Sequence, residues 1–240
     1  MNQVVKIDRL AIIGVGLIGG SLALAVKQAG AVREVLGVGR SATNLALAQQ
    51  HGLIDRVVDF AEAGQADCIL LAMPVGETAT VLAQLAPHLK AGAVVTDAGS
   101  TKVNVIAAAR AALGTRFSDF VPGHPIAGSE CNGPLAARAD LFQARKVVLT
   151  PTPETRATAQ ALVTALWTVS GAQVETLDAG LHDQVFAAVS HLPHLAAYAL
   201  VNELAQRENS AEFFRFAASG FRDFTRIAGS SPEMWRDIAL

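Results

Sequence analysis

The sequence has few of the residues that characterise disulfide-rich and metal-binding proteins. Its 240 residues include two cysteines, and only 5% of the residues are aromatic. Cys68 and Cys131 lie far apart and without metal-ligand spacing, so we interpret them as reduced thiols. We therefore expect a cytoplasmic protein with no bound metal.

An excess of one charge is also absent. The 19 basic and 21 acidic residues give a net charge of −2, which indicates neither nucleic acid nor an anionic membrane as a partner. Lys6, Asp8 and Arg9 precede the first apolar run, unlike the start of a signal peptide. No uninterrupted apolar run approaches the roughly 20 residues that span a bilayer. The hydrophobic share of 51% instead indicates a globular protein with a large core.

A glycine-rich stretch follows the first apolar run. Residues 10–13 have the composition of a strand buried on both faces, and residues 21–27 are typical of a helix. Between them, Gly14, Gly16 and Gly19 have the G-x-G-x-x-G spacing of a dinucleotide-binding turn. The helix N-terminus would receive the phosphates. The cofactor contacts expected here are Gly14, Gly16, Leu17, Ile18 and Gly19.

The end of the second predicted strand, residues 34–39, concerns the choice of cofactor. An NAD-binding fold normally has an acidic residue there, which accepts a hydrogen bond from the ribose 2′-hydroxyl. Gly39 occupies that position, and Arg40 and Ser41 follow it. Because a 2′-phosphate could pair with these two side chains, we predict that NADP is favoured over NAD.

Strands and helices continue to alternate as far as residue 152. Further strands are predicted over residues 67–73, 92–97, 120–125 and 146–151, with helices between them. This alternation predicts a Rossmann-type, doubly wound and mostly parallel α/β sheet over residues 1–152. Ligands bind at the carboxyl ends of such strands, so Met73, Pro74 and Asp97 are predicted to contact the cofactor.

Residues 153–240 are predicted to form a helical domain. Residues 179–206 are apolar nearly all round, as in a helix buried between others. Ser231 and Pro232 are typical of a helix start, yet the sequence ends at Leu240, about two turns later. We expect that a C-terminal segment is missing or that another chain covers this end.

Three polar groups are candidates for chemistry. They lie in residues 123–130, 190–194 and 220–226, and contain His124, the pair His191 and His194, and the pair Arg222 and Arg226. Taken singly, each group also has a structural explanation. His124 could be an ordinary loop histidine, the two helix histidines could be core residues with hydrogen-bond partners, and the arginines could lie at the surface. Their occurrence together with a dinucleotide loop favours an enzyme site.

Six motifs occur in a fixed order along the chain: GVGLIGGS, DAGSTK, GHPIAGSE, SHLPH, GFRDFTRIA and MWRDI. Their order and spacing resemble the prephenate/arogenate (cyclohexadienyl) dehydrogenase family of tyrosine biosynthesis over essentially the whole chain. The resemblance implies oxidation of a 4-hydroxycyclohexadienyl carboxylate with NAD(P), release of carbon dioxide, and a homodimer formed through the helical domain. The sequence departs from the family in lacking the carboxylate of NAD-preferring members, and in ending several helical turns early.

The resemblance also implies roles for individual residues. His124 is expected to be the catalytic base, with Ser100 as its hydrogen-bonding companion. His194 and Arg226 are expected to bind substrate. Ser129 and Glu130 are expected near the mouth of the pocket, and Arg222 is the next candidate for the substrate anion.

Elementary chemistry agrees with these roles. A neutral imidazole suits the removal of a hydroxyl proton near neutral pH, and a guanidinium binds a carboxylate in bidentate fashion. Because the sheet edge and the helical domain both contribute, we expect the site in the cleft between them. Two alternatives remain. One is another two-domain hydroxyacid dehydrogenase, but such enzymes usually have a catalytic lysine in the helical domain, and no lysine follows Lys146. The other is a non-catalytic, cofactor-sensing Rossmann protein.

Overall fold

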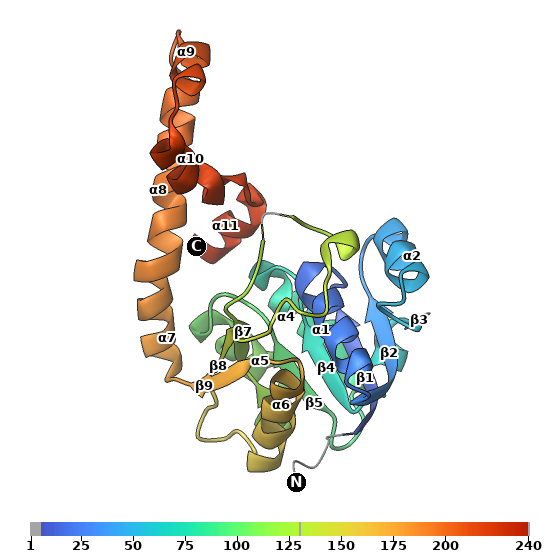
Figure 1. Ribbon diagram of the computed structural model, residues 1–240. Helices are drawn as coiled ribbons and strands as arrows, with labels where there is room; N and C mark the ends of the chain where they lie inside the picture. The colour runs from blue at the N-terminus through green and yellow to red at the C-terminus, as the bar shows by residue number, and fades with distance from the viewer. Residues whose placement is uncertain (1–5, 130, 240) are drawn as a thin grey trace.

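A parallel sheet of six strands, in the order β3-β2-β1-β4-β5-β6, dominates the first part of the chain (Figure 1). This computed structural model describes residues 6–129 and 131–239. The strands are β1 (Ile7–Ile13), β2 (Val32–Val38), β3 (Arg56–Val57), β4 (Cys68–Leu71), β5 (Val94–Asp97) and β6 (Phe120–Val121). The order reverses between β1 and β4, which makes their carboxyl ends the switch point where such sheets bind ligands. The predicted Rossmann-type fold is confirmed.

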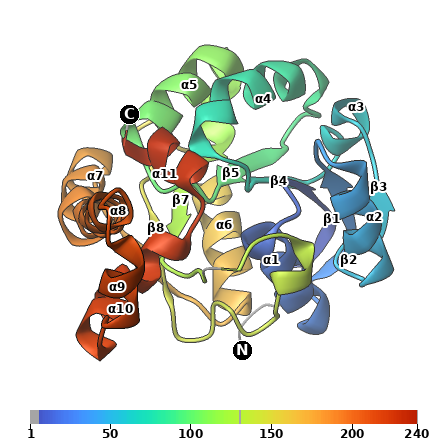
Figure 2. The same cartoon turned by 90° about the horizontal axis from the view of Figure 1, so that it is seen from above.

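Helices cover both faces of this sheet (Figure 2). One face packs against α1 (Leu17–Gln28), α2 (Ala42–Gln50) and α6 (Ala157–Val169), and the other against α3 (Phe60–Ala63), α4 (Thr78–Leu85) and α5 (Val103–Leu113). Alternate residues of β1 serve the two cores: Leu10 and Ile12 face the first, and Ala11 and Ile13 the second. A strand buried on both faces needs the continuous apolar run found in the sequence. Short 3₁₀ turns connect several elements: η1 (Val75–Glu77), η2 (Ala86–His88), η3 (Gly114–Asp119) and η4 (Pro134–Ala136).

A second, three-stranded sheet lies beside the first and consists of β7 (Gly123–Pro125), β8 (Lys146–Leu149) and β9 (Gln173–Thr176). The prediction that residues 146–151 form a sixth strand of the parallel sheet is wrong, because β8 pairs with β7 in the antiparallel sense and with β9 in the parallel sense. Pro122, between β6 and β7, has no N–H for a ladder. The sixth strand is instead β3, whose two residues are too short to show an apolar pattern. The division of the chain at residue 152 stays a prediction; α6, beyond it, packs into the same core as α1.

The last third of the chain is helical. The segment α7 (Ala179–Phe186), the π-helical turn η5 (Ala187–His191) and α8 (Leu192–Ala205) follow one another as a single long helix. Pro193 is the second residue after the π turn, as expected where a missing N–H disturbs the helical ladder. The chain returns through α9 (Ser210–Arg215), α10 (Ser219–Thr225) and η6 (Arg226–Gly229) to α11 (Pro232–Ala239), which contacts η1 and η5 (Figure 1).

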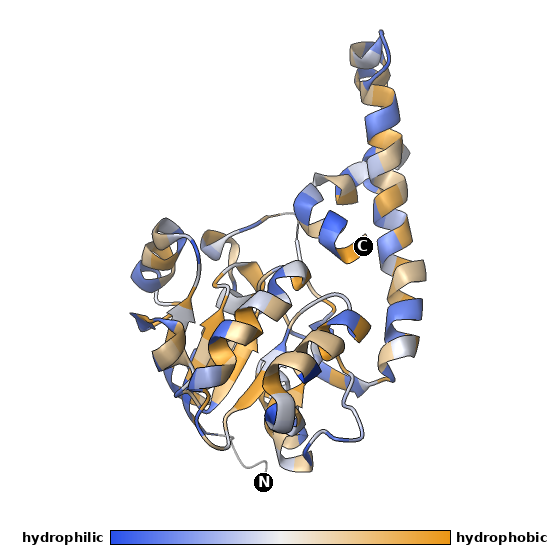
Figure 3. Cartoon of the chain, turned by 180° about the vertical axis from the view of Figure 1, so that it is seen from behind, coloured by the Kyte–Doolittle hydropathy of each residue, from blue (hydrophilic) through white to orange (hydrophobic). Residues whose placement is uncertain are grey.

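The long helix extends away from the α/β region and bears apolar side chains along its length (Figure 3). The prediction that it is buried between other helices is wrong within this chain: Val189 and Leu192 are 66% and 63% exposed. By length and composition alone, the helix Ala179–Ala205 is long and apolar enough to cross a membrane. The sequence did not indicate this, because polar residues interrupt its apolar runs. A single such helix is weak evidence for a membrane span.

Candidate functional site

The glycine loop between β1 and α1 requires two of its three glycines for steric reasons. Gly14 has φ +96°, and a Cβ atom there would lie 2.6 Å from the Ala72 carbonyl oxygen. A Cβ atom at Gly19 would lie 2.6 Å from the Gly14 oxygen. At Gly16 a Cβ atom would meet nothing within 4 Å, so that side of the loop is open. The tight turn and close helix packing predicted from the spacing are therefore both present.

The open side of this loop adjoins the N-terminus of α1, which begins at Leu17. The first backbone N–H groups of a helix, here those of Leu17, Ile18 and Gly19, have no intrahelical partner. The first turn contains no acidic side chain that would repel phosphate. Backbone donors, helix dipole and an unfilled surface at Gly16 together fit the pyrophosphate of a dinucleotide.

The residues after β2 lie at the surface. Arg40 is 80% exposed at its side chain and forms an ion pair with Glu77, whose Oε1 is 3.1 Å from Nη1. The Ser41 hydroxyl caps α2 by accepting a hydrogen bond from the Asn44 N–H at 3.2 Å. Both side chains thus have protein partners. A cofactor phosphate would have to displace these partners or bind in addition to them. Met73 and Pro74, after β4, are partly buried.

Asp97, at the end of β5, connects two loops at the sheet edge. Its carboxylate accepts hydrogen bonds from the N–H groups of Gly99, at 2.8 Å, and Gly123, at 3.0 Å, and forms a buried ion pair with Lys102. Lys102 Nζ also donates to the Gly123 carbonyl oxygen at 2.7 Å. The Asp97 carboxylate is 3% exposed and binds protein groups, and a contact of this residue with the cofactor stays a prediction.

This connection brings the Ser100 loop next to the strand that bears His124. Ser100 lies between Asp97 and Lys102, and Gly123, which both of them bind, directly precedes His124. Sequence reasoning did not assign Lys102 a role, although it lies in the DAGSTK motif. A lysine whose side chain is fully buried must have a partner, and only the tertiary structure identifies it as Asp97.

His124 is partly buried on β7. Its Nδ1 lies 2.9 Å from Nε2 of His182, and its ring makes an edge contact with Phe186 at 4.8 Å between centroids. Burial, followed by the charges of Lys102, His182 and His191, holds the pKa of His124 well below 6.5. His124 is therefore neutral at pH 7, as a general base must be.

His182 and Asp183, on α7, were missed by the sequence reasoning, which singled out only His191 and His194 within residues 179–206. His182 is fully buried, and its Nδ1 lies 2.8 Å from the Asp183 carboxylate. The signal that could have revealed them is the His-Asp pair within an otherwise apolar helix. Polar groups buried on such a face need partners, but the sequence does not say which.

Two further histidines continue this cluster along the long helix. His191 is buried, its pKa is lowered by burial, and it is close enough for its charge to affect His124. His194 stacks on Trp235, with 3.8 Å between ring centroids. Its Nδ1 donates to the Ser190 carbonyl oxygen at 2.8 Å. Neutral His194 therefore offers Nε2 as an acceptor, and donates from it only when the ring is protonated.

The remaining predicted site residues that the structure describes lie at the surface. Arg222 is exposed on α10, and Arg226 is exposed at the start of η6, where it takes part in an interaction. Ser129 is exposed beyond β7, and its hydroxyl accepts a hydrogen bond from the Cys131 N–H at 3.2 Å. Glu130 lies outside the described residues. The roles of these four residues stay predictions.

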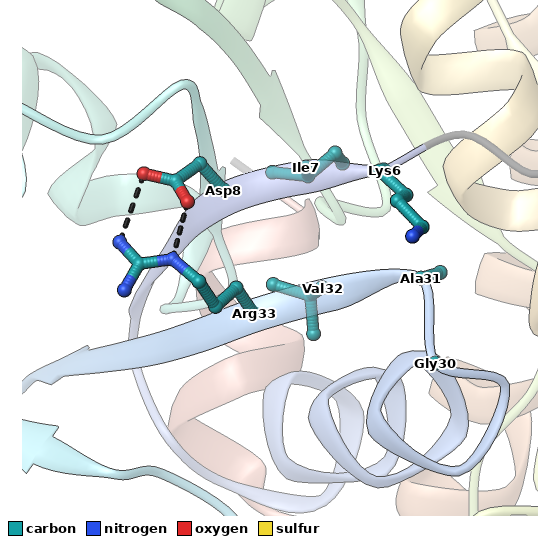
Figure 4. A pocket seen from close by; sticks show the side chains of 7 residues that line it. All are labelled: Lys6, Ile7, Asp8, Gly30, Ala31, Val32 and Arg33. Atoms are coloured by element: carbon teal, nitrogen blue, oxygen red, sulfur yellow. Dashed lines mark hydrogen bonds and ion pairs between the residues drawn. The ribbon is translucent and has the colours of Figure 1, made fainter.

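A pocket also lies at the opposite edge of the sheet, at the amino ends of β1 and β2 (Figure 4). It is lined by Lys6, Ile7, Asp8, Gly30, Ala31, Val32 and Arg33. Asp8 and Arg33 pair with each other across it. Because ligands of such sheets bind at the carboxyl ends of the strands, this pocket is not the candidate site.

Fold and site together define a class: a Rossmann-type dinucleotide-binding protein with a buried histidine cluster where its sheet edge meets a helical region. The profile described as "Prephenate dehydrogenase, nucleotide-binding domain" matches residues 22–176, and that described as "Prephenate dehydrogenase, dimerization domain" matches residues 178–240. The chain belongs to the prephenate dehydrogenase family, whose members are NAD(P)-dependent oxidoreductases. The resemblance identified from the motifs is confirmed.

Individual relatives agree with this assignment. The cyclohexadienyl dehydrogenase of Zymomonas mobilis is 39% identical over 235 residues, which cover 96% of this chain and 80% of the relative. The prephenate dehydrogenase of Bacillus subtilis is 38% identical over the whole chain, which spans 65% of that relative's length. The crystal structure of Aquifex aeolicus prephenate dehydrogenase, in complex with hydroxyphenyl propionate and NAD+, has a TM-score of 0.91 at 36% identity, over 98% of this chain and 83% of that one.

Proposed function

We propose that the protein catalyses the NAD(P)-linked oxidative decarboxylation of prephenate, arogenate or both. One observation carries the proposal: His124, held neutral by burial and neighbouring positive charge, lies at the same sheet edge as the loop that fits a dinucleotide. The names of the relatives and the ligands of the A. aeolicus complex support it. The other hydroxyacid dehydrogenases considered above are not favoured.

A dinucleotide held by the glycine loop would supply the hydride acceptor for the carbinol carbon. His124 accepts the hydroxyl proton as the hydride leaves, so positive charge does not build up on the substrate oxygen. The electrons of the ring–carboxylate bond then enter the ring, which becomes aromatic as carbon dioxide departs. Ser100, on the loop fixed to β7 by Asp97 and Lys102, would bond the same hydroxyl or His124 and align them.

Substrate anions require cations or donors on the helical side. Arg226 is proposed to bind a carboxylate in bidentate fashion, and Arg222 is the alternative cation. His194 presents Nε2 from a ring fixed by Trp235 and by the Ser190 carbonyl, which suits it to orient substrate. Ser129 and Glu130 would lie at the mouth of the site.

The test is an activity assay with the purified protein. Prephenate and arogenate are each mixed with NAD and with NADP, and reduced cofactor is followed by its absorbance. Reduction with either substrate supports the proposal, and the ratio of the four kcat/KM values gives the preferences. If neither substrate is oxidised while the protein binds NAD(P), the cofactor-sensing alternative is favoured.

We propose further that NADP is preferred over NAD. Gly39 replaces the carboxylate that would bond a ribose 2′-hydroxyl and repel a 2′-phosphate, and the exposed Arg40 side chain is close by in sequence. The exposed ion pair between Arg40 and Glu77 contributes little free energy in water. Arg40 would give up this pair to bind the more highly charged phosphate.

A homodimer through the helical region is proposed for the same chain. Val189, Leu192 and Leu195, all on the long helix, are at least 43% exposed, and the family domain matching residues 178–240 is described as a dimerization domain. Apolar side chains gathered on one element are typical of an interface. We also propose a cytoplasmic location, since both cysteines are free and Cys131 is exposed.

A further inference from the structure

Three side chains from two distant parts of the sequence form a continuous chain of hydrogen bonds. Asp183 Oδ1 lies 2.8 Å from His182 Nδ1, and His182 Nε2 lies 2.9 Å from His124 Nδ1. His182 is fully buried, so both its ring nitrogens are satisfied within the protein. No hydrogen bond from the described residues reaches the far nitrogen of His124, Nε2, which is available for a ligand.

The carboxylate end of this chain is anchored by the backbone. Asp183 accepts hydrogen bonds from the N–H groups of Lys102, at 2.8 Å, and Val103, at 2.9 Å, where α5 begins. Burial would raise the pKa of Asp183, but the hydrogen bonds from His182 and these two N–H groups outweigh it and lower that pKa. Asp183 is therefore ionised at pH 7 and can only accept hydrogen bonds.

An acceptor at one end determines the direction of every bond in the chain. His182 must carry its hydrogen on Nδ1, because the carboxylate beside that atom cannot donate. In an imidazole that carries one hydrogen, the other nitrogen has a lone pair, so His182 Nε2 accepts and His124 carries its hydrogen on Nδ1. We infer that His182 and Asp183 are positioning residues that hold His124 in its Nδ1–H tautomer, with the Nε2 lone pair directed to the substrate hydroxyl.

This inference rests on the proposed role of His124 and adds what that role requires. In the reaction the hydroxyl proton moves to His124 Nε2, and the resulting imidazolium donates its Nδ1–H to His182. The Asp183 charge, transmitted through His182, then stabilises the cation. Lys102 and His191, the other charged or titratable groups near His124, disfavour that cation, so an opposing carboxylate is needed.

The alternative is that Asp183 only caps α5 and His182 only fills the core. Two substitutions at His182 separate these explanations. In His182→Asn the amide nitrogen takes the place of Nδ1, which keeps the contact with Asp183 but leaves His124 Nδ1 without an acceptor. In His182→Gln the amide oxygen takes the place of Nε2, which keeps the acceptor for His124 but weakens the link to Asp183.

We expect His182→Asn to lower kcat by roughly 10²–10⁴-fold, the range for a lost general base and for a catalytic histidine in the wrong tautomer, with KM little changed. His182→Gln should retain kcat to within about tenfold of the unmodified protein. Thermal unfolding of both variants checks that they fold. A purely structural role predicts the reverse order, with His182→Asn the milder change, and that result would overturn the inference.

The tautomer itself can be measured without activity. In protein labelled with ¹⁵N in its histidine rings, and assigned with His124→Asn, the ¹⁵N shifts should show His124 protonated at Nδ1 at neutral pH. A hydrogen on Nε2 instead would overturn the inference. If His124→Asn left kcat unchanged, the proposed role of His124 as the base would fail, while the ¹⁵N shifts would still decide the tautomer.

Discussion

The two regions of this chain differ in how completely each buries its own apolar side chains. In β1, Leu10, Ala11 and Ile12 have no exposed surface, because helices of the same chain cover both faces of the sheet. On the long helix, Leu192 is 63% exposed although the sequence there is equally apolar. An apolar pattern therefore shows that a segment is covered, but not which chain covers it.

The same contrast applies to the chemistry. The α/β region contributes groups fixed by contacts with other elements: Lys102 bonds Asp97 and Gly123, and His124 bonds His182. The helical region contributes His194, fixed by its own helix and by Trp235, and exposed arginines. We therefore expect substitutions in the first region, and at His182 and Asp183, which are bonded to it, to affect kcat. Other substitutions in the helical region should affect KM or association.

The largest effect should come from His124→Asn. Loss of the general base should lower kcat by about 10²–10⁴-fold with substrate affinity nearly intact, because asparagine cannot accept the proton. Steady-state kinetics with the better substrate measures this. His51→Asn, at an exposed histidine after α2, is the matched control and should behave like the unmodified protein. Unchanged turnover in His124→Asn would remove His124 from the mechanism.

Arg226→Ala should show the opposite pattern. A charge-assisted hydrogen bond contributes about 1.5–3 kcal/mol, so KM should rise roughly tenfold to 10²-fold with a smaller change in kcat. Arg215→Ala, at an exposed arginine on α9, controls for loss of surface charge. A KM equal to that of the control would mean that the substrate anion is held elsewhere, with Arg222 the next candidate.

Association distinguishes the two regions directly. Leu200→Glu, on the exposed face of α8, should raise the dimer dissociation constant at least about tenfold, since a buried leucine contributes roughly 1.5–3 kcal/mol. Val57→Glu makes the same kind of change at an exposed residue of β3 and should have no effect. Light scattering over a range of concentrations compares them. Equal behaviour of the two variants would contradict a dimer through the long helix.

The smallest effect concerns the cofactor. We expect kcat/KM to favour NADP by roughly tenfold, the lower end for one charge-assisted contact. Gly39→Asp should reverse this preference, since a carboxylate bonds the 2′-hydroxyl and repels the phosphate.

The site tolerates that change, because a Cβ atom at Gly39 would lie 3.4 Å from the nearest heavy atom, in Leu45. A control substitution at another glycine, Gly52, is unsuitable, because its φ of +73° would be strained by a side chain. Arg40→Ala is the better companion variant. It should lower the NADP preference without creating one for NAD. A clear NAD preference in the unmodified protein would contradict the proposal.

Much of the fold was predictable because its signals are local. The glycine spacing between β1 and α1 determines a turn within a few residues, and apolar runs of four or more residues identify the buried strands. The sheet assignment of residues 146–151 was not predictable in this way. A strand's run of apolar residues indicates that it is buried, but does not specify its neighbours.

By itself, then, the sequence determined the Rossmann-type α/β region, the dinucleotide loop, and His124 as a candidate base within a motif. Only the tertiary structure decided what surrounds that base. His124 and His182 are 58 residues apart, and the Lys102 N–H and the Asp183 carboxylate are 81 residues apart. Such pairs depend on how β7 packs beside α7 and α5, which no local pattern encodes. Hydrogen bonds act over about 3 Å, so the protonation state of the site was decided by the packing of these elements.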